Sequence, residues 1–108
     1  MSYITAHVLD ATAGTPAAGI DVALETGAGE SIATAVTNDD GRVPELGPET
    51  LEAGHYRITF STGDYFAGRG QATFYPHVAV DFTVAEGQRH YHVPLLLSPF
   101  AYSTYRGS

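Results

Sequence analysis

The chain contains neither cysteine nor lysine. The absence of cysteine excludes disulfides, thiolate metal ligands and a cysteine nucleophile. Twelve acidic residues outnumber five basic ones, all of them arginine, and the formal net charge is −7. A chain this acidic, with no basic run, is a poor binder of nucleic acids and of anionic membranes. We therefore expect neither as a partner, and each arginine is worth tracing for a specific role.

Long apolar runs are also missing. No stretch approaches the ~18 apolar residues that a membrane span requires. The opening residues, MSYITAHVLD, have neither the basic region nor the apolar region of a signal peptide. The ending YRGS is not the SKL-type peroxisomal address. The expected location is cytoplasmic. Neither Ser98 nor Ser103 lies in a G-x-S-x-G sequence, which argues against a serine nucleophile.

The 108 residues fit one domain, covering residues 1–108, and the apolar pattern within it is typical of strands. Segments rich in Val, Ile, Thr, Tyr and Phe predict strands near 3–10, 20–26, 32–37, 42–46, 55–61, 77–84, 89–97 and 100–106. Turn residues separate them, including Gly14 to Pro16 and Asn38 to Gly41. The segment 62–70 predicts one short helix, with Asp64 as a potential cap and glycines at its end. The predicted fold is all-β, a two-sheet antiparallel sandwich of seven to eight strands with one short helix.

Histidines within predicted strands are the first candidates for chemistry. His90 and His92 are two residues apart, so their side chains point to the same face of a strand. Such a pair can supply half of a zinc site, but without cysteine this would also need His7 and a carboxylate. The other interpretation is one solvent-facing histidine and one hydrogen-bonded interior histidine, and we expect no metal. His7 shares a face with Thr5 and Leu9 and, taken alone, is typical of a structural histidine.

Arg42 directly follows an acidic turn, Asp39-Asp40-Gly41. One interpretation is a surface salt bridge to these acids, which contributes little stability. The other is a clamp for an anion or a carbonyl, because arginine offers planar, bidentate donors. Position in the sequence alone favours the salt bridge.

The last nineteen residues, HYHVPLLLSPFAYSTYRGS, predict a strand, a Ser-Pro corner and a second strand. Chain ends normally fray unless something holds them. Tyr102, Tyr105 and Arg106 are large side chains that are costly to order. This pattern indicates that the end is packed, and a subunit interface is one place where that happens.

Four motifs in order resemble the 5-hydroxyisourate hydrolases, the enzymatic relatives of transthyretin. They are HVLD at 7–10, DGRV at 40–43, YFA at 65–67 and the segment 90–108, and together they span essentially the whole chain. The terminal tetrapeptide, Tyr105 to Ser108, resembles the signature of the hydrolase branch. The hormone-carrier branch is similar through the Leu-Ser-Pro corner but lacks this ending and lacks the two histidines and the arginine.

The resemblance implies a transthyretin-like sandwich that assembles as a homotetramer, a dimer of dimers, with active sites in the channel between dimers. It implies that His7, Arg42, His92 and Ser108 are catalytic. It further implies that Arg42, Tyr105, Arg106 and Gly107 bind the substrate. Arg106 has two readings, substrate binding or anchoring of the tail by ion pairing, and Ser108 would contribute its hydroxyl or the terminal carboxylate. On this resemblance we expect catalytic roles for His7 and Arg42, in place of the structural roles that their positions alone favour.

The implied reaction is hydrolysis of 5-hydroxyisourate to 2-oxo-4-hydroxy-4-carboxy-5-ureidoimidazoline during urate degradation. This is the opening of a cyclic amide, and no cofactor is expected because the ring is already reactive. Histidine suits the proton transfers, since its unperturbed pKa of ~6.5 lies near working pH. Which histidine is the base stays open. The alternative is a transthyretin-like carrier of a small ligand, and the polarity of the channel would distinguish the two.

Overall fold

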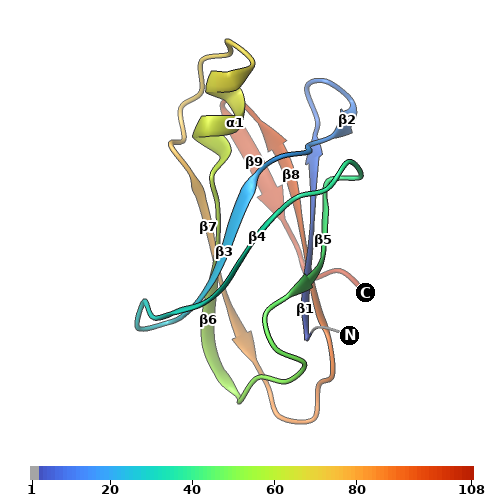
Figure 1. Ribbon diagram of the computed structural model, residues 1–108, viewed down its shortest axis with the longest axis vertical. Helices are drawn as coiled ribbons and strands as arrows, with labels where there is room; N and C mark the ends of the chain where they lie inside the picture. Colours follow the sequence, from blue (N-terminus) through green and yellow to red (C-terminus); the bar gives the residue numbers. More distant parts are fainter. Residues whose placement is uncertain (1–2) are drawn as a thin grey trace.

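Two β-sheets pack face to face in the computed structural model, which describes residues 3–108 (Figure 1). The first sheet has the order β2-β1-β8-β9, and β5 also pairs with β1. Its strands are β1 (Ile4–Asp10), β2 (Thr15–Pro16), β5 (Arg42–Leu46), β8 (Tyr91–Ser98) and β9 (Ala101–Thr104). The second sheet has the order β4-β3-β6-β7. Its strands are β3 (Asp21–Thr26), β4 (Ser31–Val36), β6 (Gly54–Phe60) and β7 (Val78–Val84).

The predicted β-sandwich is therefore confirmed, with two differences in detail. Residues 3–108 form nine strands, because β2, a two-residue strand, lies where the sequence predicted only a turn. The sheets are not antiparallel throughout, since β1 and β8 pair in parallel from Ile4 opposite Tyr91 to Asp10 opposite Leu97. Parallel neighbours need a crossover connection, and here the chain passes through the second sheet between β1 and β8.

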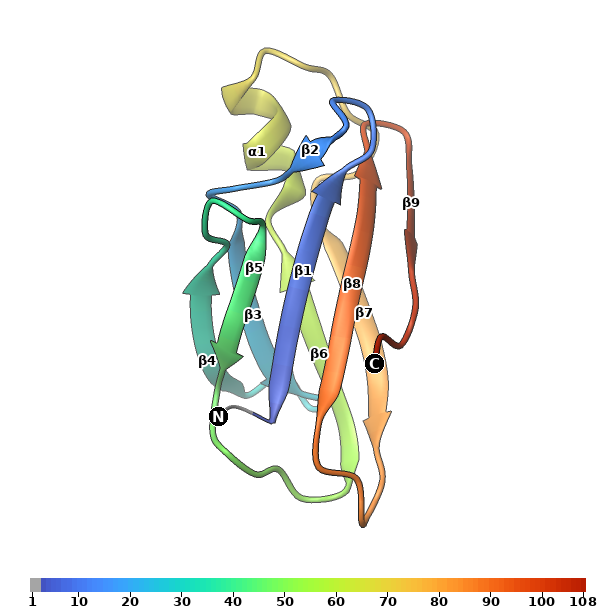
Figure 2. The ribbon, with the colours of Figure 1, turned by 90° about the vertical axis from the view of Figure 1, so that its right-hand side faces the viewer.

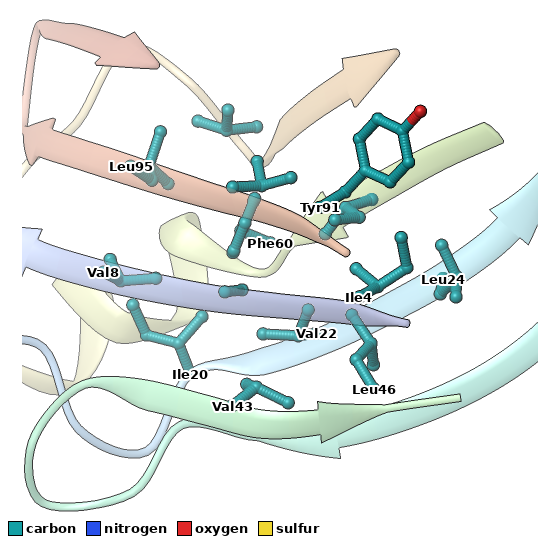
Figure 3. Packing of buried hydrophobic residues seen from close by; sticks show 14 of the residues in the cluster. Ile4, Val8, Ile20, Val22, Leu24, Val43, Leu46, Phe60, Tyr91 and Leu95 are labelled. Carbon is teal, nitrogen blue, oxygen red and sulfur yellow. The ribbon is translucent and has the colours of Figure 1, made fainter. Parts of the chain in front are cut away.

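Strand alternation places the core on one side of β1 and polar groups on the other. Ile4, Ala6 and Val8 are buried between the sheets, whereas Thr5 and His7 lie on the outer face and are partly exposed. Figure 3 shows Ile4 and Val8 facing the same interior as Phe60 and Leu95. Each such aliphatic or aromatic side chain contributes about 1.5–3 kcal/mol when fully buried. The register of β1 is consequently fixed, because a slip of one residue would bury His7.

Within residues 3–108 a single helix, α1 (Thr62–Gly68), follows β6 and covers one end of the sandwich (Figure 1). The prediction of a short helix is confirmed, but Asp64 is not its cap. Ser61 occupies the N-cap position without a side-chain cap hydrogen bond, and Asp64 lies inside the first turn. Phe66 is buried, and the Tyr65 hydroxyl donates a 2.9 Å hydrogen bond to Asp10 at the end of β1. These contacts attach the helix to the first sheet. No helix within residues 3–108 is long and apolar enough to cross a membrane.

Candidate functional site

The outer face of the first sheet gathers side chains from three neighbouring strands. In Figure 2 this face, formed by β5, β1 and β8, is turned toward the viewer. His7 on β1 is paired with Arg42 on β5, and Thr5 is paired with His92 on β8. The ring centroids of His7 and His92 are 6.4 Å apart. Three of the residues selected from the sequence, His7, Arg42 and His92, are therefore neighbours.

A tight turn holds Arg42 at the start of β5. The side-chain oxygen of Asn38 accepts hydrogen bonds from the backbone N–H groups of Asp40 and Arg42, both at 3.0 Å. Gly41 has a φ of +72°, and a Cβ there would collide with the Val8 carbonyl oxygen. Only glycine fits this combination of backbone angle and close approach. Within residues 3–108, Arg42 forms no ion pair with the acids of the turn. Its guanidinium thus stays available to a ligand.

The same turn orients His7. Its Nε2 lies 3.0 Å from the backbone carbonyl oxygen of Asp40. A carbonyl oxygen only accepts hydrogen bonds, so Nε2 must be the protonated nitrogen. In the neutral ring the lone pair is then on Nδ1.

His90 and His92 share one hydroxyl group. The Oγ1 of Thr5 lies 3.1 Å from His90 Nε2 and 2.7 Å from His92 Nδ1. The prediction that the two histidines share a face agrees with this arrangement. The interpretation with one solvent-facing and one interior histidine does not agree with it, because both rings are partly buried and hydrogen-bonded. Within residues 3–108, no group of three or more His, Asp or Glu side chains is arranged to hold a metal ion.

The environment of His92 favours its neutral form. Partial burial lowers the pKa of His92 below its ordinary value, and the positive charge of Arg42 lowers it further. His7 and His90 act in the same direction when they are charged. His92 is consequently an uncharged imidazole at neutral pH.

Replacing Arg42 with glutamine is expected to raise the pKa of His92, because it removes a cation that disfavours the imidazolium. NMR titration of the His92 ring measures the shift. Arg89→Gln is the matched control, since Arg89 is exposed and is not among the groups that act on His92. An unchanged or lower pKa in the Arg42 variant would show that the two groups do not interact.

The C-terminal segment crosses directly over His92. The backbone N–H of Gly107 donates a 2.8 Å hydrogen bond to the His92 carbonyl oxygen. A Cβ on Gly107 would lie only 2.5 Å from His92 Cδ2. The second predicted strand ends at Thr104 rather than near 106, and Gly107 forms an isolated bridge with His92 instead. The tail therefore packs against this imidazole and leaves no room for a side chain at position 107.

Two hollows flank the crossing point, and the predicted tail residues divide between them. The hollow of about 570 Å³ on one side is lined by Thr5, Arg42, Pro44, His92 and Ser108, together with Ala6, Val43 and His90. The hollow of about 470 Å³ on the other side is lined by Tyr105, Arg106 and, again, His92, among other residues. Ser108 thus shares a hollow with Arg42 and His92, and in this chain Tyr105 and Arg106 do not.

Arg106 is engaged with its own chain. Its Nη2 donates a 3.0 Å hydrogen bond to Gln88 Oε1, and its guanidinium lies over the Tyr91 ring, 4.5 Å from the centroid. Of the two readings of this residue, the contacts favour anchoring of the tail. They do so through a neutral amide and an aromatic ring rather than through the ion pair that the sequence suggested.

Two contributors to the site, Thr5 and Asn38, were not selected from the sequence, and a third, His90, was considered only as half of a metal site. The alternation of β1 placed Thr5 on the face of His7, but only the parallel register with β8 brings it to His92. Asn38 carried a usable signal, because Asx residues at the start of an Asp-Gly turn often hold the turn with their side chains.

Known proteins with similar sequences and structures agree with the fold and motifs described above. Residues 4–107 match the HIUase/Transthyretin family. A 5-hydroxyisourate hydrolase of Salmonella dublin is 44% identical over 111 residues, which covers 99% of this chain and 82% of that protein.

Two solved structures are also similar. The 5-hydroxyisourate hydrolase of Klebsiella pneumoniae has a TM-score of 0.91 and 39% identity, covering 99% of this chain and 100% of that one. Sea bream transthyretin in complex with thyroxine has a TM-score of 0.89 and 37% identity, covering 97% of this chain and 94% of that one. The backbone is thus shared by a hydrolase and a hormone-binding protein, and only side chains can separate the two functions. On this match over nearly its whole length, the chain belongs to the HIUase/transthyretin family.

Proposed function

We propose that this protein hydrolyses 5-hydroxyisourate by adding water to an amide carbonyl of its six-membered ring. The observation that carries the proposal is the juxtaposition, on the outer face of β5, β1 and β8, of two imidazoles and an arginine that has no ion-pair partner within residues 3–108. Relatives at about 44% identity that are named 5-hydroxyisourate hydrolase support the choice of substrate.

Each group suits one part of the reaction. The attacking water must lose a proton, the carbonyl oxygen must be stabilised as it becomes negative, and the leaving nitrogen must gain a proton. The imidazoles of His7 and His92 orient the water, and one of them carries its proton, a contribution of about 10²–10⁴-fold. Arg42 donates to the carbonyl edge of the ring, and a fixed donor at a developing oxyanion adds about 10²–10³-fold. Ser108, which lines the same hollow as Arg42 and His92, offers a hydroxyl to the substrate or to His92.

Assembly into a homotetramer would complete the site. Within residues 3–108, β7 and β9 are edge strands of their sheets and lie on the same side of the sandwich (Figure 2). Exposed strand edges are suited to pairing with a second copy. On the face that carries the site, Leu9 lies beside Leu96, which is 37% exposed. Phe100, at 64% exposure, extends the apolar surface at the β8–β9 corner. Edge pairing followed by face-to-face packing would cover these side chains and enclose the hollow beside His92.

The direct test is to generate 5-hydroxyisourate from urate in situ and follow its ultraviolet decay with and without the protein. We expect a decay rate that rises in proportion to protein concentration. Equal decay in both samples would refute the proposal. The carrier alternative predicts instead that the protein slows decay or leaves it unchanged while binding a hormone-like ligand such as thyroxine. Sedimentation velocity on the same sample measures the assembly, which we expect to have the mass of four chains.

Replacing Gly107 with alanine is expected to lower kcat at least tenfold, because the new methyl group must displace either the tail or the His92 ring. Gly68→Ala is the matched control, since a Cβ there meets nothing within 4 Å. Circular dichroism should show that both variants keep the fold. If Gly107→Ala retained full activity with an unmoved tail, the proposed role of the packing against His92 would be wrong.

A further inference from the structure

The hydroxyl of Thr5 connects two histidines, but it has only one proton to donate. Its Oγ1 lies within hydrogen-bond distance of His90 Nε2 and His92 Nδ1, at 3.1 and 2.7 Å. A hydroxyl donates one hydrogen bond and accepts up to two. Within residues 3–108 the Thr5 hydroxyl has no hydrogen-bond partner other than these two rings, so it donates to one imidazole and accepts from the other. The direction of this relay decides which ring nitrogen of His92 carries its proton.

His90 settles the direction because of its second nitrogen. The Nδ1 of His90 is buried and has no hydrogen-bond partner within residues 3–108. A buried N–H without an acceptor is rarer in proteins than a buried acceptor without a donor. The proton of His90 therefore belongs on Nε2, where it is donated to Thr5. The Thr5 proton then goes to His92 Nδ1, which leaves the proton of neutral His92 on Nε2.

We propose that Thr5, held by His90, is a positioning residue that fixes His92 as the Nε2–H tautomer, so that His92 acts as a neutral hydrogen-bond donor to the developing oxyanion. This inference rests on the proposed hydrolysis of 5-hydroxyisourate. It separates the roles of the two imidazoles. His92 gives no proton away, and His7, whose neutral ring has its lone pair on Nδ1, is the proton carrier.

The proton balance supports this division. His7 Nδ1 takes a proton from water as the water oxygen bonds to the carbonyl carbon. When the carbon–nitrogen bond of the ring breaks, the same proton passes from His7 to the leaving nitrogen. His92 Nε2–H and Arg42 hold the carbonyl oxygen throughout, and both end the cycle in their starting states. A neutral imidazole is a very weak acid, so it serves better as a fixed dipole than as a proton source. The lowered pKa of His92 agrees with a ring that stays neutral.

Thr5→Val tests the relay, because valine keeps the shape of threonine and removes the hydroxyl. We expect kcat for 5-hydroxyisourate generated in situ to fall about tenfold, and Thr5→Ser to stay within about twofold of wild type. Thr59→Val, at a half-buried threonine of the other sheet, controls for the loss of a strand hydroxyl. Full activity of Thr5→Val would overturn the positioning role.

A second readout does not depend on turnover. ¹⁵N NMR of the histidine rings, recorded above the titration of His92 and without substrate, distinguishes protonated from unprotonated ring nitrogens. We expect the proton of wild-type His92 on Nε2, and a mixture of tautomers in Thr5→Val. A proton on Nδ1 in the wild type would reverse the relay and contradict the inference. If the protein failed to hydrolyse 5-hydroxyisourate but the NMR result held, the tautomer assignment would stand and the catalytic role of His92 would fall with the proposed function.

Discussion

Replacing His7 with glutamine is expected to lower kcat for 5-hydroxyisourate by about 10²–10⁴-fold, the contribution of a positioned general base. Glutamine places an amide NH₂ near the position of the imidazole Nε2, so the hydrogen bond to the Asp40 carbonyl can survive. What disappears is the nitrogen lone pair that accepts the proton of the attacking water. The change therefore removes the chemistry and keeps the local structure.

The measurement is the steady-state rate of ultraviolet decay of 5-hydroxyisourate, with the spontaneous rate subtracted. His77→Gln is the matched control, because His77 is exposed and lies next to β7 of the second sheet. Sedimentation and circular dichroism should match wild type for both variants. A His7→Gln protein with more than half of the wild-type kcat would exclude His7 as the base.

Arg42→Lys is the second change with a large expected effect. Lysine keeps the positive charge but offers a compact ammonium in place of two parallel N–H donors. If Arg42 holds the carbonyl edge of the ring and its developing charge, kcat should fall by about 10²–10³-fold. The pKa of His92 should change less than in Arg42→Gln, because a cation remains nearby.

The matched control for this change is Arg89→Lys, which alters an exposed arginine. If Arg42→Lys raised KM and left kcat unchanged, Arg42 would bind substrate and transition state equally. That result would remove Arg42 from the oxyanion site and would leave His92 as the donor there.

The strands of this protein are readable from its sequence because most of them are half-buried and alternate with a period of two. β1 illustrates the rule, since its alternation predicted that Thr5, His7 and Leu9 share one face. The parallel pairing of β1 with β8 was not predictable in the same way. It depends on how the two sheets stack, which is a property of the whole chain and not of a local pattern. β2 was missed because two residues are too few to show any period.

The residues of the candidate site also differ in how far the sequence could predict them. His7, Arg42 and His92 were identified by their chemical type and by family resemblance, and the structure brings all three together. Thr5 has no chemistry that would mark it in isolation, and His90 was considered only as half of a metal site. Their importance comes from a register that puts one hydroxyl between two rings. The separation of Tyr105 and Arg106 from Ser108 likewise follows from the path of the tail across His92, which no local pattern encodes.

The assignment of His7, Arg42 and His92 to catalysis requires that the substrate binds beside them, and a crystal structure with urate tests this directly. Urate is the stable, planar precursor of 5-hydroxyisourate and presents similar carbonyl edges. We predict that it lies in the hollow beside Ser108, with a carbonyl oxygen accepting hydrogen bonds from the Arg42 guanidinium and from His92 Nε2. Urate bound instead in the hollow beside Tyr105 and Arg106, without contact to Arg42, would contradict the assignment of the site.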